Sequence, residues 1–282
     1  MNTQLLTKIV NLIRETSSSL PGDVLAALKC AQRREAKGSS AAVVLKTILD
    51  NCAIAKRRGT PLCQDTGTLT FFVDERLRRK VTPAALKKAV ALATERGYLR
   101  KNTIDSVTGR SYDDNVCDGA PVIHYIQPSQ PSLPTVTLVM KGGGSENMSR
   151  QYSLPDATLG AGRDLAGVRK CLLDAVVKTQ GYGCAPGILG VCIGGDRATG
   201  FETAKLQLLR TLDDKSPDKS LARLEKQVLD EANSLDIGPM GLGGKTTLLG
   251  VKIAARSRVP ASFFVTVAYM CWACRRRTVV WE

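Results

Sequence analysis

Short apolar runs that read as β-strands recur along this chain and alternate with segments of helical periodicity. Among them are L-T-F-F-V, T-V-T-L-V-M, I-L-G-V-C-I and L-L-G-V-K-I. The second of these runs alternates with the period of two that marks a strand. Between strands, Leu165, Val168, Leu172 and Val176 recur at helical spacing. This alternation predicts an α/β (α+β) fold class.

The beginning of the chain reads as helical throughout. Pro21-Gly22 breaks the first helix, and Ser39-Ser40 is a plausible N-cap for a later one. We therefore predict a single domain over residues 1–282, with a helical portion at 1–58 and an α/β portion at 59–282. No internal repeat or low-complexity linker divides it in the sequence.

The chain is strongly basic, with 40 Lys and Arg against 26 Asp and Glu, which gives a net charge of +14. Such a balance suits a nucleic acid, an acidic surface, an anionic substrate or a solvated basic surface. The basic clusters Arg33-Arg34, Lys56–Arg58 and Arg275–Arg277 lie far apart and are not interleaved with aromatic residues. No nucleic-acid-binding signature accompanies them. We predict a solvated basic surface and no nucleic-acid partner.

The N-terminal segment is amphipathic, with charge at Lys8, Arg14 and Glu15, whereas a secretory signal needs an unbroken apolar centre. No apolar run approaches the roughly 18 to 20 residues of a membrane span. The nine cysteines are an odd number, which argues against a disulfide scaffold. We therefore predict a cytoplasmic protein without a membrane partner.

Three cysteines lie in loops rather than in helical apolar patterns such as those around Cys30, Cys52 and Cys171. Cys63 lies in P-L-C-Q-D-T-G-T, Cys184 lies in G-Y-G-C-A-P-G, and Cys271 ends the last long apolar run. Thiolates are the usual ligands of iron–sulfur clusters. Spacing alone leaves a core role, a solvent-facing role and a ligand role open for all three.

The strings around these cysteines carry more information than their spacing. They are P-L-C-Q-D-T-G-T, K-G-G-G-S-E-N, G-C-A-P-G with I-G-G-D-R-A-T-G, I-G-P-M-G-L-G-G-K-T-T, and P-A-S-F-F-V-T-V-A-Y-M-C-W-A. Together, from about residue 40 to Cys274, they resemble the class I (iron–sulfur) fumarate hydratase family. The resemblance is narrower to the alpha subunit of its two-subunit fumarate hydratase and L(+)-tartrate dehydratase members.

The resemblance implies a [4Fe-4S] cluster held by Cys63, Cys184 and Cys271 in loops at element ends. Three protein ligands leave one iron open to act as a Lewis acid on a substrate hydroxyl. Cys192 and Cys274 lie near the same motifs, and Cys274 is the stronger rival for the C-terminal ligand.

The resemblance also implies a site for a small dicarboxylate. Gln64 and Asp65 would meet the substrate beside the cluster, with Asp65 as the catalytic contact; an Asx turn with Gly67 is the structural alternative. Arg100 would clamp a carboxylate, and Gly143 and Gly144 would offer backbone N–H groups. Lys245 and Thr246 would support the cluster or a carboxylate.

Two features depart from simple expectations. The family often has R-H-P-A-S before the last strand, but this chain has S-R-V-P-A-S, with Val259 in place of the histidine. Either Arg258 substitutes, the substrate differs, or activity is impaired. The string G-L-G-G-K-T-T invites a phosphate-loop interpretation, but Pro239 stands where that motif needs glycine and a strand follows instead of a helix.

We interpret the chain as the alpha subunit of an iron–sulfur hydro-lyase that dehydrates a 2-hydroxy dicarboxylate. Malate-to-fumarate conversion is favoured, L(+)-tartrate is the alternative substrate, and an inactive cluster-bearing interaction protein is a further alternative. No loop offers a convincing base for the substrate carbon, and single-chain family members are about twice as long. We therefore expect a separate beta subunit that completes the active site in an α2β2 heterotetramer.

Overall fold

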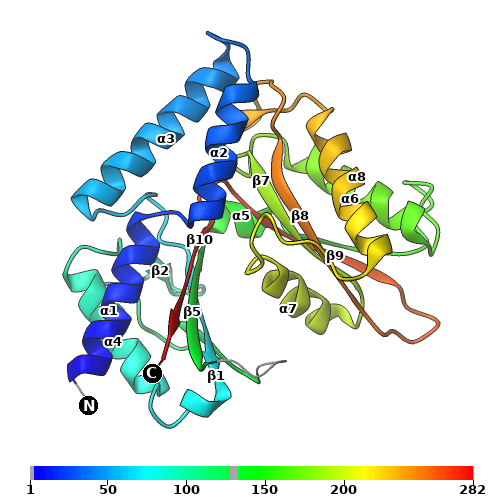
Figure 1. Ribbon diagram of the computed structural model, residues 1–282. Helices are drawn as coiled ribbons and strands as arrows, with labels where there is room; N and C mark the ends of the chain where they lie inside the picture. The colour runs from blue at the N-terminus through cyan, green and yellow to red at the C-terminus, as the bar shows by residue number, and fades with distance from the viewer. Residues whose placement is uncertain (1–2, 128–132, 282) are drawn as a thin grey trace. The chain divides into compact units, whose positions relative to one another are not determined.

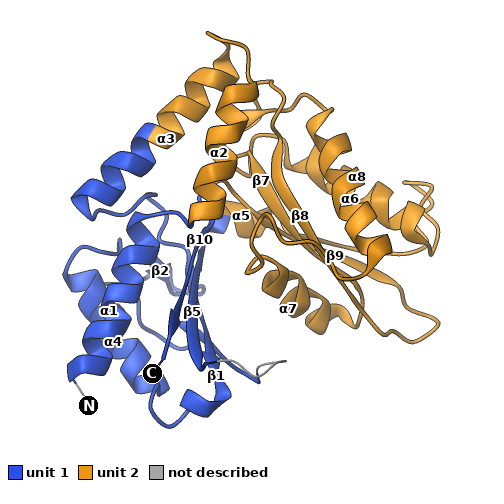
Figure 2. Cartoon of the chain, viewed as in Figure 1, with its two compact units in different colours: residues 1–21, 50–143, 273–282 blue, residues 22–49, 144–272 orange. Residues whose placement is uncertain are grey.

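The computed structural model describes residues 3–127 and 133–281, and the chain forms two compact units within it (Figure 2). Unit 1 comprises residues 1–21, 50–143 and 273–282, and unit 2 comprises residues 22–49 and 144–272. The helix α3 (Ser40–Arg58) begins in unit 2 and ends in unit 1. Residues 1–2, 128–132 and 282 of the predicted domain lie outside the described residues, and its single-domain organisation stays a prediction.

Unit 1 is built on a four-stranded sheet in the order β10-β5-β1-β4. Its strands are β1 (Thr68–Asp74), β4 (Val122–Ile126), β5 (Thr135–Lys141) and β10 (Arg275–Val280). β1 pairs in parallel with β4 and antiparallel with β5, and β10 adds antiparallel to the other edge of β5. The final strand is therefore a structural part of the first unit.

Helices α1 (Thr3–Ser18) and α4 (Pro83–Glu95) pack on one face of this sheet (Figure 1). Their apolar sides meet strand residues such as Phe71 and Leu138, which are 0% exposed. Thr82 caps α4, because its hydroxyl accepts the Ala85 N–H at 3.3 Å and Pro83 begins the helix. The unit also carries the short helix η1 (Glu75–Leu77) and a hairpin of β2 (Thr103–Ile104) and β3 (Ser111–Tyr112).

Unit 2 is built on a second four-stranded sheet in the order β6-β9-β7-β8. Its strands are β6 (Arg150–Ser153), β7 (Gly187–Gly194), β8 (Leu248–Arg256) and β9 (Phe264–Met270). β7 pairs in parallel with β8 and antiparallel with β9, whose other edge pairs with β6. Every residue of β7 is buried, as expected for a strand covered on both faces.

Helices cover both faces of the second sheet (Figure 1). α6 (Leu165–Thr179) and α8 (Lys219–Asn233) share one apolar core with β7, β8 and β9. α7 (Arg197–Gln207) lies on the opposite face, where it comes so close to β7 that a Cβ at Gly190 would collide with the Ala204 carbonyl oxygen. The remaining helices are α2 (Gly22–Arg34), α5 (Gly143–Asn147) and η2 (Pro239–Gly241).

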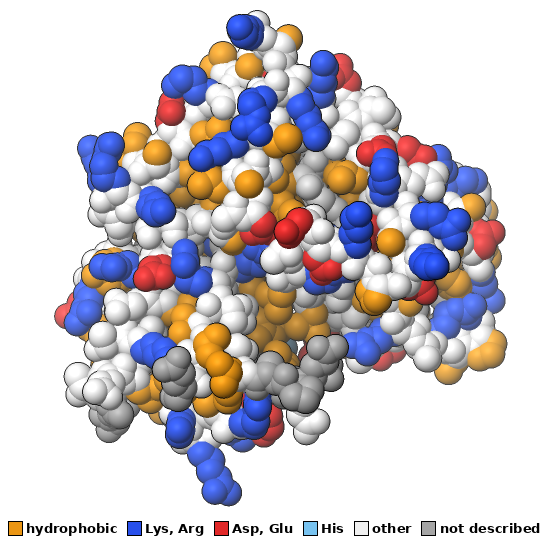
Figure 3. Space-filling model, viewed as in Figure 1, with side chains coloured by type: hydrophobic (Ala, Val, Ile, Leu, Met, Phe, Trp, Pro, Cys, Tyr) orange, Lys and Arg blue, Asp and Glu red, His pale blue; other side chains and the backbone are white. Residues whose placement is uncertain are grey.

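The predicted α/β class and its helical N-terminal portion are confirmed, since helices are the regular structure described in residues 3–58. The interpretation of Arg275–Arg277 as solvated surface is wrong in part. Arg275 is only 1% exposed and Arg276 only 8%, because this run forms β10 against β5. Elsewhere Lys and Arg side chains are interspersed with Asp and Glu over the visible face (Figure 3).

Within residues 3–127 and 133–281, no helix is long and apolar enough to cross a membrane. All nine cysteines are free thiols in this structure. Cys184 is exposed, three are partly buried (Cys30, Cys63 and Cys117), and the other five are buried.

Candidate functional site

The loop before β1 turns tightly around Asp65, as the alternative interpretation of this loop predicts. The Asp65 carboxylate accepts the Gly67 N–H at 2.7 Å through Oδ1, which makes an Asx turn, and Gly67 has a φ of +73°. The Asp65 N–H points back at the Cys63 Sγ at 3.4 Å. One turn therefore fixes the thiol and the carboxylate together, and both are half-buried.

Glycine at position 67 is required by close packing as well as by backbone conformation. A Cβ there would lie 2.5 Å from the Lys141 carbonyl oxygen and 2.8 Å from the Gly142 nitrogen, at the end of β5. Real side chains essentially never approach backbone atoms so closely. Glycine at position 67 therefore allows the Asp65 turn to pack directly against the end of β5.

We predict that Gly67→Ala destabilises the chain by about 2–4 kcal/mol, from left-handed strain together with overpacking. Gly109→Ala is the matched control, because Gly109 has a φ of +72° but nothing within 4 Å of its Cβ position. That control should lose only about 1–2 kcal/mol from strain. Urea unfolding of both variants is the measurement, and equal losses would contradict the packing argument.

Three N–H donors hold the Asp65 carboxylate. Besides Gly67, the Asn102 side-chain amide donates to Oδ1 at 2.9 Å, and the Gly143 N–H donates to Oδ2 at 2.7 Å. Both oxygens are therefore fixed as acceptors, and the carboxylate has a single orientation. The Gly143 N–H that the family resemblance offers to substrate is engaged with Asp65 in this structure.

The segment that carries Arg100 is tied to the same turn. The buried Thr66 hydroxyl donates to the Arg100 carbonyl oxygen and accepts the Arg100 N–H, both at 2.9 Å. The side chains of Arg100 and Gln64 are exposed. The backbone of Arg100 is thus fixed beside Asp65, while its guanidinium is left on the surface of the unit.

A cavity of about 440 Å³ opens beside this turn. Asp65, Asn102 and Gly143 line it, together with Cys117 and Asp118 from the polar loop after β3. Asn102 belongs to no sequence motif, and its polar surroundings in residues 99–119 are the only sequence signal for it. The cavity lies within unit 1 and is large enough for a small organic acid.

In unit 2, the Cys184 loop and the Cys271 segment lie side by side. The Trp272 N–H donates to the Cys184 carbonyl oxygen at 3.3 Å. Cys184 is exposed and has a φ of +51°, which is uncommon for a residue other than glycine. Cys271 is 9% exposed, and its N–H donates to the Ser145 hydroxyl at 3.2 Å.

The glycines around Cys184 make room for one aromatic ring. A Cβ on Gly183 or on Gly187 would collide with the Tyr269 ring on β9. Burial raises the pKa of Tyr269, and the neighbouring Cys271 and Cys184 side chains raise it further. The glycines of G-Y-G-C-A-P-G therefore accommodate the Tyr269 ring, and the same loop leaves Cys184 exposed.

The string I-G-P-M-G-L-G-G-K-T-T supports the Cys184 loop. The Met240 N–H donates to the Ala185 carbonyl oxygen at 2.9 Å, and a Cβ on Gly241 would lie 2.8 Å from Gly181. The Lys245 N–H donates to the Glu35 carboxylate at 3.0 Å. β8 follows this loop, as expected, so the helix that a phosphate loop needs is replaced by a strand.

Three buried cysteines are poor nucleophiles and poor ligands. Burial raises the pKa of Cys52 to about 11 and that of Cys171 to about 12, and it also raises the pKa of Cys192. A thiol that stays protonated does not bind metal readily. Cys274 is likewise 0% exposed, whereas Cys184 is open to solvent.

The three loop cysteines offer thiolates, which are the ligands that an iron–sulfur cluster needs. Among the described residues, no three His, Cys, Asp or Glu side chains are grouped to hold a metal, and the three loop cysteines divide between the two units. Cys63 nevertheless receives an N–H donor at sulfur, as cluster ligands do. Arg275, 1% exposed, has Nε and Nη1 without a partner among the described residues, and such a buried cation suits a nearby anionic group.

Arg258 is engaged in its own loop, although one alternative makes it a substitute for the family histidine. Its Nη1 donates to the carbonyl oxygens of Val259, Pro260 and Ser262 at 3.1–3.2 Å. Its guanidinium also stacks 4.4 Å above the Phe263 ring. These contacts give Arg258 a structural role, while the Val259 side chain is 66% exposed.

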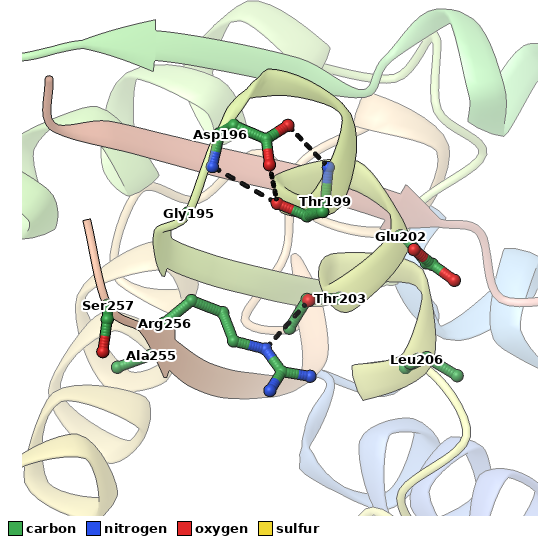
Figure 4. Close-up of a pocket in the computed structure, with 9 residues that line it drawn as sticks. All are labelled: Gly195, Asp196, Thr199, Glu202, Thr203, Leu206, Ala255, Arg256 and Ser257. Atoms are coloured by element: carbon green, nitrogen blue, oxygen red, sulfur yellow. Dashed lines mark hydrogen bonds between the residues drawn. The ribbon is translucent and has the colours of Figure 1, made fainter. Parts of the chain in front are cut away.

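A second cavity, of about 630 Å³, opens at the G-G-D-R-A-T-G string in unit 2 (Figure 4). Asp196 caps α7 there, accepting N–H bonds from Ala198 and Thr199 and the Thr199 hydroxyl, and these bonds lower the pKa of Asp196. Arg256 donates to the Thr203 hydroxyl at 3.2 Å. Because a carboxylate already occupies this helix N-terminus, the string acts as a helix cap.

Comparison with known proteins places these features in one family. A family model described as "Fumarate hydratase (Fumerase)" matches residues 6–280. A Geobacillus stearothermophilus protein named "Putative fumarate hydratase class I" is 47% identical over 281 residues, which cover 97% of this chain and 54% of that protein. The chain therefore spans about half the length of that relative.

Two shorter relatives match over nearly their whole length. A Methanocaldococcus jannaschii protein named "Putative L(+)-tartrate dehydratase subunit alpha" is 34% identical, covering 95% of this chain and 94% of that protein. The "L(+)-tartrate dehydratase subunit alpha" of Escherichia coli (strain K12) is 30% identical, covering 98% of this chain and 90% of that protein. The chain belongs to the fumarate hydratase (fumerase) family.

Proposed function

We propose that this chain is the alpha subunit of an iron–sulfur hydro-lyase that reversibly removes water from a small 2-hydroxy dicarboxylate. The observation that carries the proposal is the Asp65 carboxylate, fixed by three N–H donors in the same turn as the Cys63 thiol. Family membership supports the reaction class, and the relatives named for fumarate hydratase and tartrate dehydratase support a dicarboxylate substrate.

In this proposal Cys63, Cys184 and Cys271 hold a [4Fe-4S] cluster, since iron–sulfur dependence is typical of the class I family. When bound, the cluster would supply a Lewis acid that makes hydroxide a better leaving group. Burial raises the pKa of Cys52, Cys171 and Cys192 and so keeps these thiols protonated. This supports excluding them from the cluster ligands.

The chain's own side chains would then orient the substrate. Asp65 would accept a hydrogen bond from the substrate hydroxyl, since both of its oxygens are held as acceptors in one orientation. Arg100 would clamp one carboxylate with its exposed guanidinium. Gln64 and the N–H of Gly144 would complete the polar contacts, and Gly143 would contribute through Asp65, to which its N–H donates.

A partner chain would complete this site. Dehydration needs a base at the substrate carbon as well as an acid at the leaving group. The relatives named "subunit alpha" match this chain over 90–94% of their length, which supports a separate beta subunit. An α2β2 assembly rests on the family resemblance alone. The nine free thiols support a reducing compartment such as the cytoplasm.

Two alternatives follow from specific observations. The tartrate dehydratase names of the relatives matched over most of their length favour L(+)-tartrate as the second candidate substrate. The exposed Val259, in place of the family histidine, favours an inactive cluster-bearing interaction protein as the third candidate function.

The test is an anaerobic assay of the purified chain, alone and mixed with its partner chain, against malate, fumarate and L(+)-tartrate. We expect dicarboxylate hydration or dehydration by the mixture and little turnover by the isolated chain. Substantial turnover by the isolated chain would overturn the two-subunit part of the proposal. Cluster content without turnover on any of the three acids would favour the interaction protein.

A further inference from the structure

Asn102 makes a contact with the site that its place in the sequence does not suggest. It lies 37 residues after Asp65, yet its Nδ2 donates to Asp65 Oδ1 at 2.9 Å. A carboxylate offers only acceptors, so the amide group must present its NH₂ to Asp65. Asn102 thus supplies the one side-chain donor among the three that hold this carboxylate.

The backbone of Asn102 is itself held by a buried amide. Asn115 is 1% exposed and has a φ of +59°. Its Oδ1 accepts the N–H of Asn102 at 2.8 Å and that of Thr103 at 3.1 Å. Its Nδ2 donates to the Arg100 carbonyl oxygen at 2.8 Å and to the Thr94 hydroxyl at 3.1 Å.

The orientation of the Asn115 amide follows from these partners. Two backbone N–H groups require an acceptor, and a backbone carbonyl requires a donor, so only one of the two amide orientations satisfies all of them. Asn115 therefore fixes the backbone from Arg100 to Thr103. Thr66 fixes the same segment to the Asp65 turn through its two bonds to Arg100.

We propose that Asn102 is a positioning residue of the hydro-lyase site, which holds Asp65 in its working orientation from a backbone that Asn115 and Thr66 make rigid. The inference rests on the proposed function of Asp65. It goes further because it assigns the polar loop 99–119 the role of positioning Asp65, which is distinct from contact with substrate. Asn102 acts through Asp65, so its effect on turnover disappears when Asp65 is disabled.

The first test compares turnover numbers of the chain mixed with its partner. Asn102→Ala should lower kcat about tenfold to a hundredfold, as loss of a supporting hydrogen bond does at other sites, with little change in KM. Asn102→Asp, which is nearly isosteric but places a carboxylate against Asp65, should lower kcat further. Asn11→Ala, at an exposed position on α1, is the control and should leave kcat unchanged.

A double-mutant cycle separates positioning from a structural role. In an Asp65→Asn background, adding Asn102→Ala should change kcat by less than about twofold, because residues that act as a unit are not additive. Losses that multiply in the double variant would overturn the inference. So would an Asn102→Asp variant with wild-type kcat.

A stability measurement tests the contact without any assay of turnover, so that its failure is distinct from failure of the proposed function. Asn102→Asp should lower the melting temperature of the chain by about 2–4 °C, the shift expected from roughly 1 kcal/mol at this size. Adding Asp65→Asn to that variant removes one of the two facing carboxylate charges and should recover part of the loss. A swapped pair no more stable than Asn102→Asp alone would contradict the contact.

Discussion

Serine at Cys63, at Cys184 or at Cys271 is expected to abolish hydro-lyase activity and to remove iron from the purified protein. Each substitution exchanges a soft thiolate for a poorly coordinating hydroxyl at one of the three proposed ligand positions. Iron content after anaerobic purification is the measurement, with circular dichroism to show that each variant remains folded.

The remaining cysteines provide matched controls for this experiment. Cys192→Ser and Cys30→Ser should keep both iron and activity. The informative rival is Cys274, which lies three residues after Cys271 and is 0% exposed. Iron retained in Cys271→Ser but lost in Cys274→Ser would reassign the C-terminal ligand.

Asp65→Asn is expected to lower kcat by about a hundredfold to ten-thousandfold, the range in which a positioned acid–base group contributes. The variant keeps the shape of the side chain and its Asx turn. It replaces one acceptor oxygen with an NH₂ group, which cannot accept from its present N–H donors. Steady-state rates with saturating dicarboxylate are the measurement.

Asp74→Asn is a useful comparison for this prediction. Asp74 is a buried carboxylate at the far end of β1, where hydrogen bonds and charge from Arg76 lower the pKa of Asp74. Its replacement should cost stability but leave kcat nearly unchanged in the folded protein. Similar losses of kcat in both variants would mean that Asp65 acts through the fold rather than at the substrate.

Much of the fold could be predicted because local rules and tertiary structure agree. Asp65 and Gly67 are unfavourable inside a strand, and β1 indeed begins at Thr68. The Thr82-Pro83 pair begins α4, and the Ser39 hydroxyl accepts the Ala42 N–H at 3.2 Å as predicted. In these places the residue type alone determines where an element begins.

Other elements could not be predicted because they depend on partners far away in the chain. The run Arg275–Val280 becomes a strand only because the edge of β5 is available for pairing. A row of three arginines has little strand character of its own. The sequence interpretation of this run as surface charge failed for that reason.

The candidate site also contains residues that local motifs predict and residues whose roles depend on distant partners. Short motifs marked Cys63, Asp65 and Cys184 as candidates, since each lies in a turn or loop whose residues are close in sequence. Asn102 and Asn115 were missed because their roles arise from side-chain hydrogen bonds across long sequence separations. An asparagine in a polar loop is ordinary until its partners are known.

In the proposed function, this chain carries an iron–sulfur cluster at the hydro-lyase site. Iron and acid-labile sulfide, determined on protein purified without oxygen, test it most directly. We expect a brown protein with about four irons and four sulfides per chain, as a [4Fe-4S] cluster requires. A folded, colourless chain free of iron would contradict it.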